Sequence, residues 1–232
     1  MRYLGGKSKI SKRITECILA HTPNRGHLIE PFVGGGGMLA TLGPHFKRAT
    51  VNDKHPDVAM LWRALSEGWA PPTVISKAQY DELRISNEPS ALRGFVGFGV
   101  SFGGKWFGGM ARTDGRNYAA ESARGLMRDM GRLKSVKLTA LNGDYEQLTV
   151  TRDDVVYCDP PHANTTGYTD AFDSVKFWKW AEKISKVASI YVSEYRAPPK
   201  WRSLWACTRT RDMRGDLKSS SQVTEQLFTL PQ

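Results

Sequence analysis

The chain has 232 residues, of which 40% are apolar and 24% charged, as in an ordinary globular protein. This length allows one large domain, or one domain that carries an insertion. No apolar run is long enough to cross a bilayer, and the residues from Met1 to Lys7 lack the apolar core of a signal peptide. We therefore expect a cytoplasmic protein that does not contact membranes.

The formal net charge is +10 and the sequence pI is about 9.6. Such an excess either serves solubility alone or attracts an anionic partner, of which nucleic acid is the commonest. The three cysteines, Cys17, Cys158 and Cys207, are odd in number and far apart, so neither a disulfide framework nor a Cys/His metal site is indicated. We expect three buried thiols and no bound metal.

The first part of the chain has the order strand, glycine loop, helix that opens a nucleotide-binding α/β fold. Ile10, Ile14 and Ile18 recur at helical spacing, and residues 27–30 are typical of a buried strand. Glycines 34–37 follow, and a helix is expected directly after them. Their spacing is not that of a dinucleotide fingerprint, so a diphosphate ligand is not indicated. Bare backbone instead suits a bulky neutral or cationic ligand, and a flexible loop is the alternative.

The second predicted strand covers residues 49–53 and ends in Asp53, about 20 residues past the glycine loop. An acid in this place commonly accepts hydrogen bonds from both ribose hydroxyls of an adenosine-containing cofactor. The alternative role is a cap for the helix predicted over residues 56–67, since Asp is a favourable N-cap residue. Asp57 could provide that cap and leave Asp53 for the ribose.

The alternation of strands and helices stops between residues 68 and 134. A helix capped by Ser76 is expected there, and Phe95 and Phe98 are expected to pack into the core. Glycine pairs then interrupt the helical pattern and leave four side chains on a mobile basic loop: Lys105, Trp106, Arg112 and Arg116. Such a loop suits contact with phosphates and stacking or wedging against bases, and a surface loop with one buried Trp is the alternative.

The α/β pattern resumes after residue 134. Strands are expected at residues 136–141, 154–158, 189–193, 205–210 and 224–230, with a helix at residues 175–186. Residues 211–222 are polar and are expected to form a flexible loop. The sequence thus predicts one α/β domain from residues 1–67 and 135–232. Residues 68–134 form an insertion that ends in a helix over residues 119–132 with a basic face.

A short apolar strand stops at one acid and two prolines. Residues 155–158 are followed by Asp159, Pro160, Pro161 and His162. Because prolines cannot continue a strand ladder, the backbone must turn out of the sheet at this point. One carboxylate, rigid carbonyl groups and a ring side chain therefore lie at the carboxyl end of a strand, where open α/β sheets bind ligands.

Several motifs follow one another along the chain: Tyr3-Leu4-Gly5-Gly6-Lys7, Glu30-Pro31-Phe32-Val33-Gly34-Gly35-Gly36, Asn52-Asp53, residues 78–84, Tyr157-Cys158-Asp159-Pro160-Pro161, Thr166-x-Tyr168 and residues 192–195. This ordered set spans nearly the whole chain and resembles the Dam-type DNA adenine methylase family. The resemblance implies a Rossmann-like methyltransferase sheet that uses S-adenosylmethionine, with a small, mostly helical insertion that recognises DNA.

The resemblance also implies the roles of particular residues. Those expected to bind S-adenosylmethionine are Tyr3, Lys7, Phe32, Gly34, Gly36, Asp53, Asp144 and Asp159. Those expected at the catalytic position are Asp159, Pro160, Pro161 and His162. The implied product is adenine methylated at N-6 in double-stranded DNA, and the expected state of the protein is a monomer or weak dimer.

The chemistry of this reaction explains the acid and the prolines. The amino lone pair of adenine is delocalised into its ring, so the nitrogen is a poor nucleophile. Asp159 and the carbonyl of Pro160 can accept its hydrogens, which frees the lone pair and stabilises the positive charge that develops on nitrogen. A base inside a duplex cannot reach such a pocket, so it must be flipped out.

His162 stands where the family has tyrosine or a similar aromatic residue that stacks on the flipped base. A histidine ring can also stack, and it titrates near neutral pH. Tyr157, Tyr168 or Phe172 could supply another aromatic wall. The alternatives are a cytosine N-4 methyltransferase, which needs the same acid and prolines, and a non-catalytic DNA-binding protein on this scaffold. The compact chain is similar to phage or prophage members, and its short insertion implies no target sequence.

Overall fold

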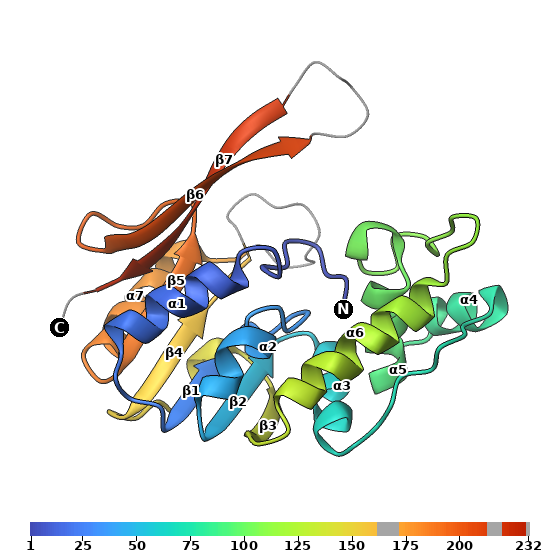
Figure 1. The fold of residues 1–232 in the computed structure, drawn as a ribbon, viewed down its shortest axis with the longest axis horizontal. Helices are drawn as coiled ribbons and strands as arrows, with labels where there is room; N and C mark the ends of the chain where they lie inside the picture. Colours follow the sequence, from blue (N-terminus) through green and yellow to red (C-terminus); the bar gives the residue numbers. More distant parts are fainter. Residues whose placement is uncertain (162–171, 213–219, 231–232) are drawn as a thin grey trace.

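The computed structural model describes residues 1–161, 172–212 and 220–230 (Figure 1). Seven strands form one sheet in the order β3-β2-β1-β4-β5-β7-β6. Their bounds are β1 His27–Glu30, β2 Arg48–Asp53, β3 Lys137–Asn142, β4 Asp154–Cys158, β5 Ser189–Glu194, β6 Arg202–Asp212 and β7 Ser220–Thr229. Strands β1 to β5 are parallel, whereas β7 runs antiparallel to both β5 and β6.

This order confirms the predicted α/β fold class with a Rossmann-like sheet. The strand order reverses between β1 and β4, and in such sheets ligands bind outside the carboxyl ends of the strands at that point. The sheet therefore brings together the ends of β1, β2 and β4, which carry the glycine loop, Asp53 and Asp159.

The described helices are α1 Ser11–His21, α2 Leu39–Leu42, α3 Pro56–Ser66, α4 Lys77–Ile85, α5 Ala91–Gly94, α6 Tyr118–Arg132 and α7 Ser174–Ser185. Ser76 caps α4 in a reciprocal capping box with Gln79, as its position predicts. The helix after the glycine loop is only one turn long. It tightens into a 3₁₀ turn over Gly43–His45, where Pro44 lacks the backbone N–H that would continue it.

Both faces of the sheet are covered. Val155 and Tyr157 of β4 belong to the buried cluster beneath α1, α2, α3 and α6, whereas Val156 and Cys158 belong to a second cluster beneath α7. Successive strand residues point to opposite faces, so a strand that is buried on both sides reads as a continuous apolar run. This confirms the interpretation of residues 155–158 as a central strand.

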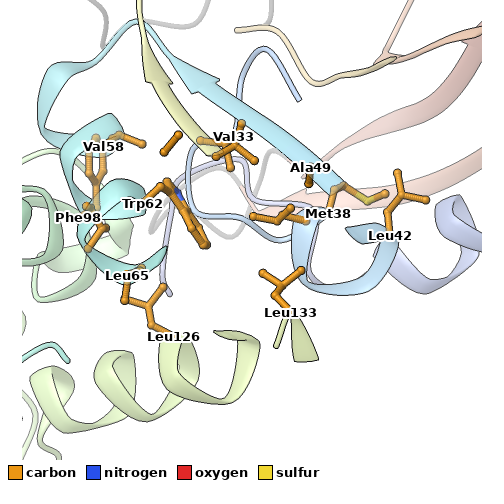
Figure 2. Close-up of a cluster of buried hydrophobic side chains, with 14 of the residues drawn as sticks. Val33, Met38, Leu42, Ala49, Val58, Trp62, Leu65, Phe98, Leu126 and Leu133 are labelled. Atoms are coloured by element: carbon orange, nitrogen blue, oxygen red, sulfur yellow. The ribbon is translucent and has the colours of Figure 1, made fainter. Parts of the chain in front are cut away.

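Residues 68–134 are not packed as a separate body. Figure 2 shows Trp62 and Leu65 of α3 near Phe98 and Leu126, and these four residues belong to the same buried cluster as Leu133. Phe95 and Phe98 are buried as expected, on a π-helical turn over Phe95–Gly99. The segment therefore extends the main core, and its function as a separate recognition domain stays a prediction.

The C-terminal hairpin corrects one prediction. Residues 211–212 and 220–222 lie inside β6 and β7, where the ladder pairs Asp212 with Ser220, rather than in the expected loop. The hairpin extends away from the rest of the sheet (Figure 1), and its strands are paired through the backbone. Because this part of the hairpin does not pack on the core, its sequence lacks the apolar alternation that predicts a strand. The prediction of three buried thiols was also wrong, since Cys17 and Cys207 are half-buried.

Within the described ranges, no helix is both long and apolar enough to span a membrane.

Candidate active site

The ammonium group of Lys7 lies at the centre of the site. Its Nζ is 2.7 Å from Oδ1 of Asp159 and 3.3 Å from Oε1 of Glu225, and the lysine side chain is only 4% exposed. Burial alone would lower the pKa of Lys7, but the two carboxylates outweigh burial and raise this pKa above its usual value. Lys7 is therefore charged and neutralises one of the two acids.

Three distant segments supply this group. Lys7 precedes α1 and accepts the backbone N–H groups of Ile10 and Ser11 at 2.9 Å, so the helix start holds its backbone. Asp159 follows β4, and Glu225 lies on β7. The predicted partners Lys7 and Asp159 thus meet.

Sequence reasoning missed Glu225, although a signal exists. Val223, Glu225 and Leu227 alternate along β7, and Leu227 is buried. An acid within an inward-facing row of a strand is unusual unless it is paired.

Glu30 ends β1 beside β4 and is buried. Burial, and then the charge of Asp159, raise the pKa of Glu30 well above its usual value, which favours the protonated form. Its Oε1 is buried and has no hydrogen-bond partner within the described ranges. The sequence contains Glu30 in the glycine-loop motif, but the motif alone gives it no role.

Asp53 is the buried acid at the end of β2. Its Oδ2 accepts the N–H of Gly34 and its Oδ1 accepts the N–H of His55, each at 2.9 Å. Burial raises the pKa of Asp53 to about 6 against the lowering effect of these two hydrogen bonds. Each oxygen keeps a lone pair that can accept a further hydroxyl, as the ribose role requires.

Asp57 does not cap α3 as expected. The N-cap residue is His55, and it makes no side-chain capping bond. The buried Asp57 carboxylate lies 2.6 Å from Arg93 and accepts the N–H of Ser90 at 2.9 Å. This ion pair is possible because Arg93 packs against α3 from α5, so the acid joins the two helices.

The glycine loop lies against two of the protein's own rings. A Cβ added to Gly34 would stand 2.8 Å from the ring of Tyr3, and one added to Gly36 would stand 2.1 Å from the ring of Trp62. The indole N–H of Trp62 also donates to the carbonyl of Gly34 at 2.9 Å. The bare backbone therefore allows close packing of Tyr3 and Trp62, and its contact with a cofactor stays a prediction.

Phe32 and Asp144 flank the loop at the ends of β1 and β3. The half-buried ring of Phe32 packs against Tyr145 and Phe177, at centroid distances of 5.3 and 5.8 Å. The Asp144 carboxylate accepts the N–H of Glu146 and caps a 3₁₀ turn over Tyr145–Gln147. Both side chains are at the edge where a cofactor would lie, and neither position tests their predicted roles.

The catalytic motif is described only up to Pro161, which is half-buried, as is Asp159, whereas Pro160 is buried. His162 and Tyr168 lie outside the described residues. Tyr157 cannot form the aromatic wall, since it is 2% exposed and its hydroxyl donates to Ser193 at 2.8 Å inside the core.

Phe172 remains beside the site. It packs on Phe32 at a centroid distance of 6.0 Å, and this contact keeps it a candidate for an aromatic wall.

The expected mobile basic loop is instead held by aromatic packing. The ring of Trp106 lies 4.2 Å from His55 and 4.9 Å from Phe98, with the guanidinium of Arg93 4.8 Å from its centre. An intercalating role would require this ring to leave its pocket. Lys105 next to it is half-buried.

The two arginines of this loop differ in their partners. Arg116 pairs with Glu121 at 2.7 Å, whereas Arg112 is exposed and makes no ion pair with any described residue. Both line a cavity of about 380 Å³. Contact of this loop with DNA stays a prediction.

The described parts of the chain contain no group of three His, Cys, Asp or Glu side chains that could hold a metal ion.

Two features of the site agree with the predicted methyltransferase. Asp159 and two prolines lie where the strand order reverses, and the buried Asp53 is bonded to the glycine loop. Residues 3–89 match the D12 class N6 adenine-specific DNA methyltransferase family. The matched part contains Tyr3, Lys7, the glycine loop and Asp53, and it ends before Asp159. The match confirms the predicted resemblance, a methyltransferase activity and S-adenosylmethionine as the methyl donor. No curated protein sequence matches this methyltransferase.

Several solved structures are similar to the chain at low identity. The rRNA methyltransferase aviRa from Streptomyces viridochromogenes is 17% identical with a TM-score of 0.46, covering 96% of this chain and 84% of that one. The N-methyltransferase NodS from Bradyrhizobium japonicum WM9, in complex with S-adenosyl-L-homocysteine, is 11% identical with a TM-score of 0.45, covering 97% and 87%. An rRNA methylase from Streptococcus thermophilus is 8% identical with a TM-score of 0.41, covering 96% of both chains. Similarity at this level carries no conclusion about substrate.

The donor set of the methyltransferase fits S-adenosylmethionine. Asp53 offers two acceptors to a pair of hydroxyls, and Oε1 of Glu30 is a further buried polar atom without a hydrogen-bond partner among the described residues. Asp159 and Glu225 together with Lys7 leave one negative charge, which suits a sulfonium.

Proposed function

We propose that this methyltransferase methylates the N-6 amine of adenine in double-stranded DNA, with the target base flipped out of the duplex. The observation that carries the proposal is the ion pair between Lys7 and Asp159, beside two prolines at the carboxyl end of β4. It holds a carboxylate in a fixed direction at the point where the strand order reverses.

The proposed chemistry uses Asp159 and Pro160 as acceptors. Lys7 contacts Oδ1 of Asp159, and in the proposed complex the other oxygen of Asp159 accepts one amino hydrogen of adenine, while the carbonyl of Pro160 accepts the second. S-adenosylmethionine supplies a methyl group on sulfonium, and the N–C bond forms as the C–S bond breaks with its electron pair left on sulfur. The carboxylate stabilises the positive charge that develops on nitrogen, and the methylated amine then releases one proton to solvent.

The remaining residues bind and enclose the two substrates. Asp53 accepts the ribose hydroxyls, and Tyr3 and Phe32 bound the cofactor on two sides of the glycine loop formed by Gly34 and Gly36. Asp144 lies on the adenine side. Pro161 fixes the turn that presents His162, whose ring stacks on the flipped base. These roles rest on the family resemblance and on the shared position of the groups at one edge of the sheet.

DNA binding is proposed for the basic insertion loop. Lys105 and Arg112 contact phosphates, while Trp106 and Arg116 contribute once their present partners are exchanged for DNA. The net charge of +10 supports an anionic partner.

The reaction is tested by incubating the protein with methyl-labelled S-adenosylmethionine and duplex DNA, then digesting the DNA to nucleosides. We expect the label on N-6 of adenine, and a loss of at least about 100-fold in Asp159→Asn, since one acceptor of the developing charge becomes an amide. The matched control is Asp153→Asn, an exposed acid before the opposite end of β4, which should keep wild-type activity.

Three alternative outcomes would each contradict a different part of the proposal. Label on N-4 of cytosine would overturn the choice of base, and preferential labelling of a competing RNA would overturn the choice of nucleic acid. Cofactor binding measured by calorimetry without any transfer would indicate a DNA-binding protein on a methyltransferase scaffold.

A further inference from the structure

We propose that Glu225 is a positioning residue of the methyl-transfer centre: it holds the Lys7 ammonium against Asp159 and thereby fixes the direction of the catalytic carboxylate. The inference deepens the proposed function and rests on it. It assigns a role to a residue that lies outside every motif of the sequence.

Nζ of Lys7 lies between two carboxylates, 2.7 Å from Asp159 and 3.3 Å from Glu225. The side chains are 22% exposed for Asp159 but 10% for Glu225 and 4% for Lys7. The pair of Lys7 and Glu225 is therefore enclosed, and only Asp159 retains access to a substrate.

Lys7 and Glu225 lie in segments that differ in rigidity. Lys7 carries a long flexible side chain and precedes α1 in a segment without regular structure, next to Gly5 and Gly6. Glu225 instead lies in β7, which is paired with β6 on one side and β5 on the other. The neighbouring Gln226 also donates from its side chain to the carbonyl of Tyr195 at 3.1 Å. The strand thus provides a fixed point that orients the long Lys7 side chain.

Two carboxylates and one ammonium leave the centre with one negative charge, which favours a reaction whose centre is cationic throughout. With glutamine at position 225 that net charge would disappear, and Lys7 would neutralise Asp159 alone. Glu225 therefore keeps Asp159 an effective acceptor although the acid is ion-paired.

Glu225 and Leu227 point to the same face of β7, and Leu227 is buried in the cluster beneath α1. An acid in this row is costly to bury unless it has a charged partner. Lys7 is that partner, so the strand retains a glutamate where packing alone would favour an apolar residue.

The test is a double-mutant cycle between Glu225→Gln and Lys7→Met, with three measurements on each variant. They are the single-turnover rate of methyl transfer to DNA, the dissociation constant of S-adenosylmethionine, and, where Lys7 is present, the titration of its ammonium by NMR of ¹⁵N-labelled lysine. We expect Glu225→Gln to lower the rate about 10- to 100-fold, as for other groups that orient a catalytic side chain, and to change cofactor affinity less than about threefold. The pKa of Lys7 should fall.

In the Lys7→Met background the same substitution should change the rate less than about twofold, because Glu225 acts only through Lys7. Glu225→Asp keeps the charge and should give an intermediate rate with a raised pKa of Lys7. If Glu225→Gln does not fold, Glu225→Asp takes its place throughout the cycle. Glu182→Gln removes the carboxylate that pairs with Lys200 on the surface at 2.7 Å, and this control should change none of the three measurements.

The proposal is overturned if Glu225→Gln leaves the rate and the Lys7 titration unchanged, or if it lowers the rate equally with and without Lys7, which would indicate a purely structural role. A wild-type protein that transfers no methyl group to DNA would instead contradict the proposed function. The Lys7 titration in the same samples would still decide whether Glu225 holds the lysine.

Discussion

The carboxylate of Asp53 accepts the backbone N–H of Gly34 at 2.9 Å, and this bond ties the end of β2 to the loop after β1. The acid thus shapes the glycine loop in addition to offering acceptors to a ligand. Because its pKa is raised to about 6 by burial, its two tasks depend on pH in a range that is easy to measure.

Cofactor affinity should rise with pH through about 6 and become constant above about 7. The ribose hydroxyls need the ionised carboxylate, so the affinity should fall by up to about tenfold for each pH unit below 6. Asp53→Asn should bind weakly and lose this dependence, whereas Asp81→Asn, which changes a half-buried acid of α4 paired with Lys77, should retain it. Calorimetry between pH 5 and 8 checks the result, and an unchanged pH profile in Asp53→Asn would contradict it.

The same raised pKa has an opposite effect on folding. The folded state binds the Asp53 proton more tightly than the unfolded state, whose pKa is near 3.8. The contribution of Asp53 to the free energy of unfolding should therefore fall as pH rises from about 4 to about 6, by about 3 kcal/mol, and stay constant above that. Urea unfolding of the wild type and Asp53→Asn at pH 4 and pH 8 measures this difference.

Gly36→Ala should destabilise the protein by at least about 2 kcal/mol. The backbone at Gly36 has φ +69°, and an added Cβ would stand 2.1 Å from the buried ring of Trp62. Gly125→Ala in α6 is the matched control, since nothing lies within 4 Å of its added Cβ, and it should stabilise by up to about 1 kcal/mol. Equal midpoints of the two variants in thermal unfolding would refute the steric argument.

Arg112→Ala should weaken DNA binding and reduce the slope of log affinity against log salt by about 1. Arg112 is exposed and makes no ion pair within the described parts of the chain, so it can neutralise a phosphate directly. Arg116→Ala should have a smaller effect, because Arg116 must first leave Glu121. Fluorescence titrations with duplex DNA at several salt concentrations compare the two, and a larger effect of Arg116→Ala would reverse the assignment.

His162→Tyr should keep or raise the rate of methyl transfer if residue 162 stacks on the flipped base, because tyrosine offers a larger ring. The exposed His45 gives the control His45→Tyr, which should not change the rate. A complete loss of activity in His162→Tyr alone would instead reveal a specific requirement for the imidazole.

The sequence by itself determined the α/β class, the position of most helices and strands, and the motif that links residues 3–89 to a methyltransferase family. These are local signals. Apolar periodicity, a serine cap before α4 and two prolines after β4 each act within a few residues, so they can be recognised without knowing the fold.

The local signals failed where distant packing decides the outcome. The glycines of the loop allow the rings of Tyr3 and Trp62 to pack against the backbone. Asp57 pairs with Arg93 instead of capping α3. Trp106 fills an aromatic pocket rather than extending from a loop. In each case the partner comes from another element, and its approach is set by how the elements pack.

Only the tertiary structure brought Glu225 to Lys7 and Asp159. These residues lie near the start of the chain, after β4 and on β7, and no spacing in the sequence relates them. The antiparallel insertion of β7 beside β5 turns the row of Glu225 and Leu227 toward α1, where the enclosed ammonium of Lys7 makes a buried carboxylate tolerable.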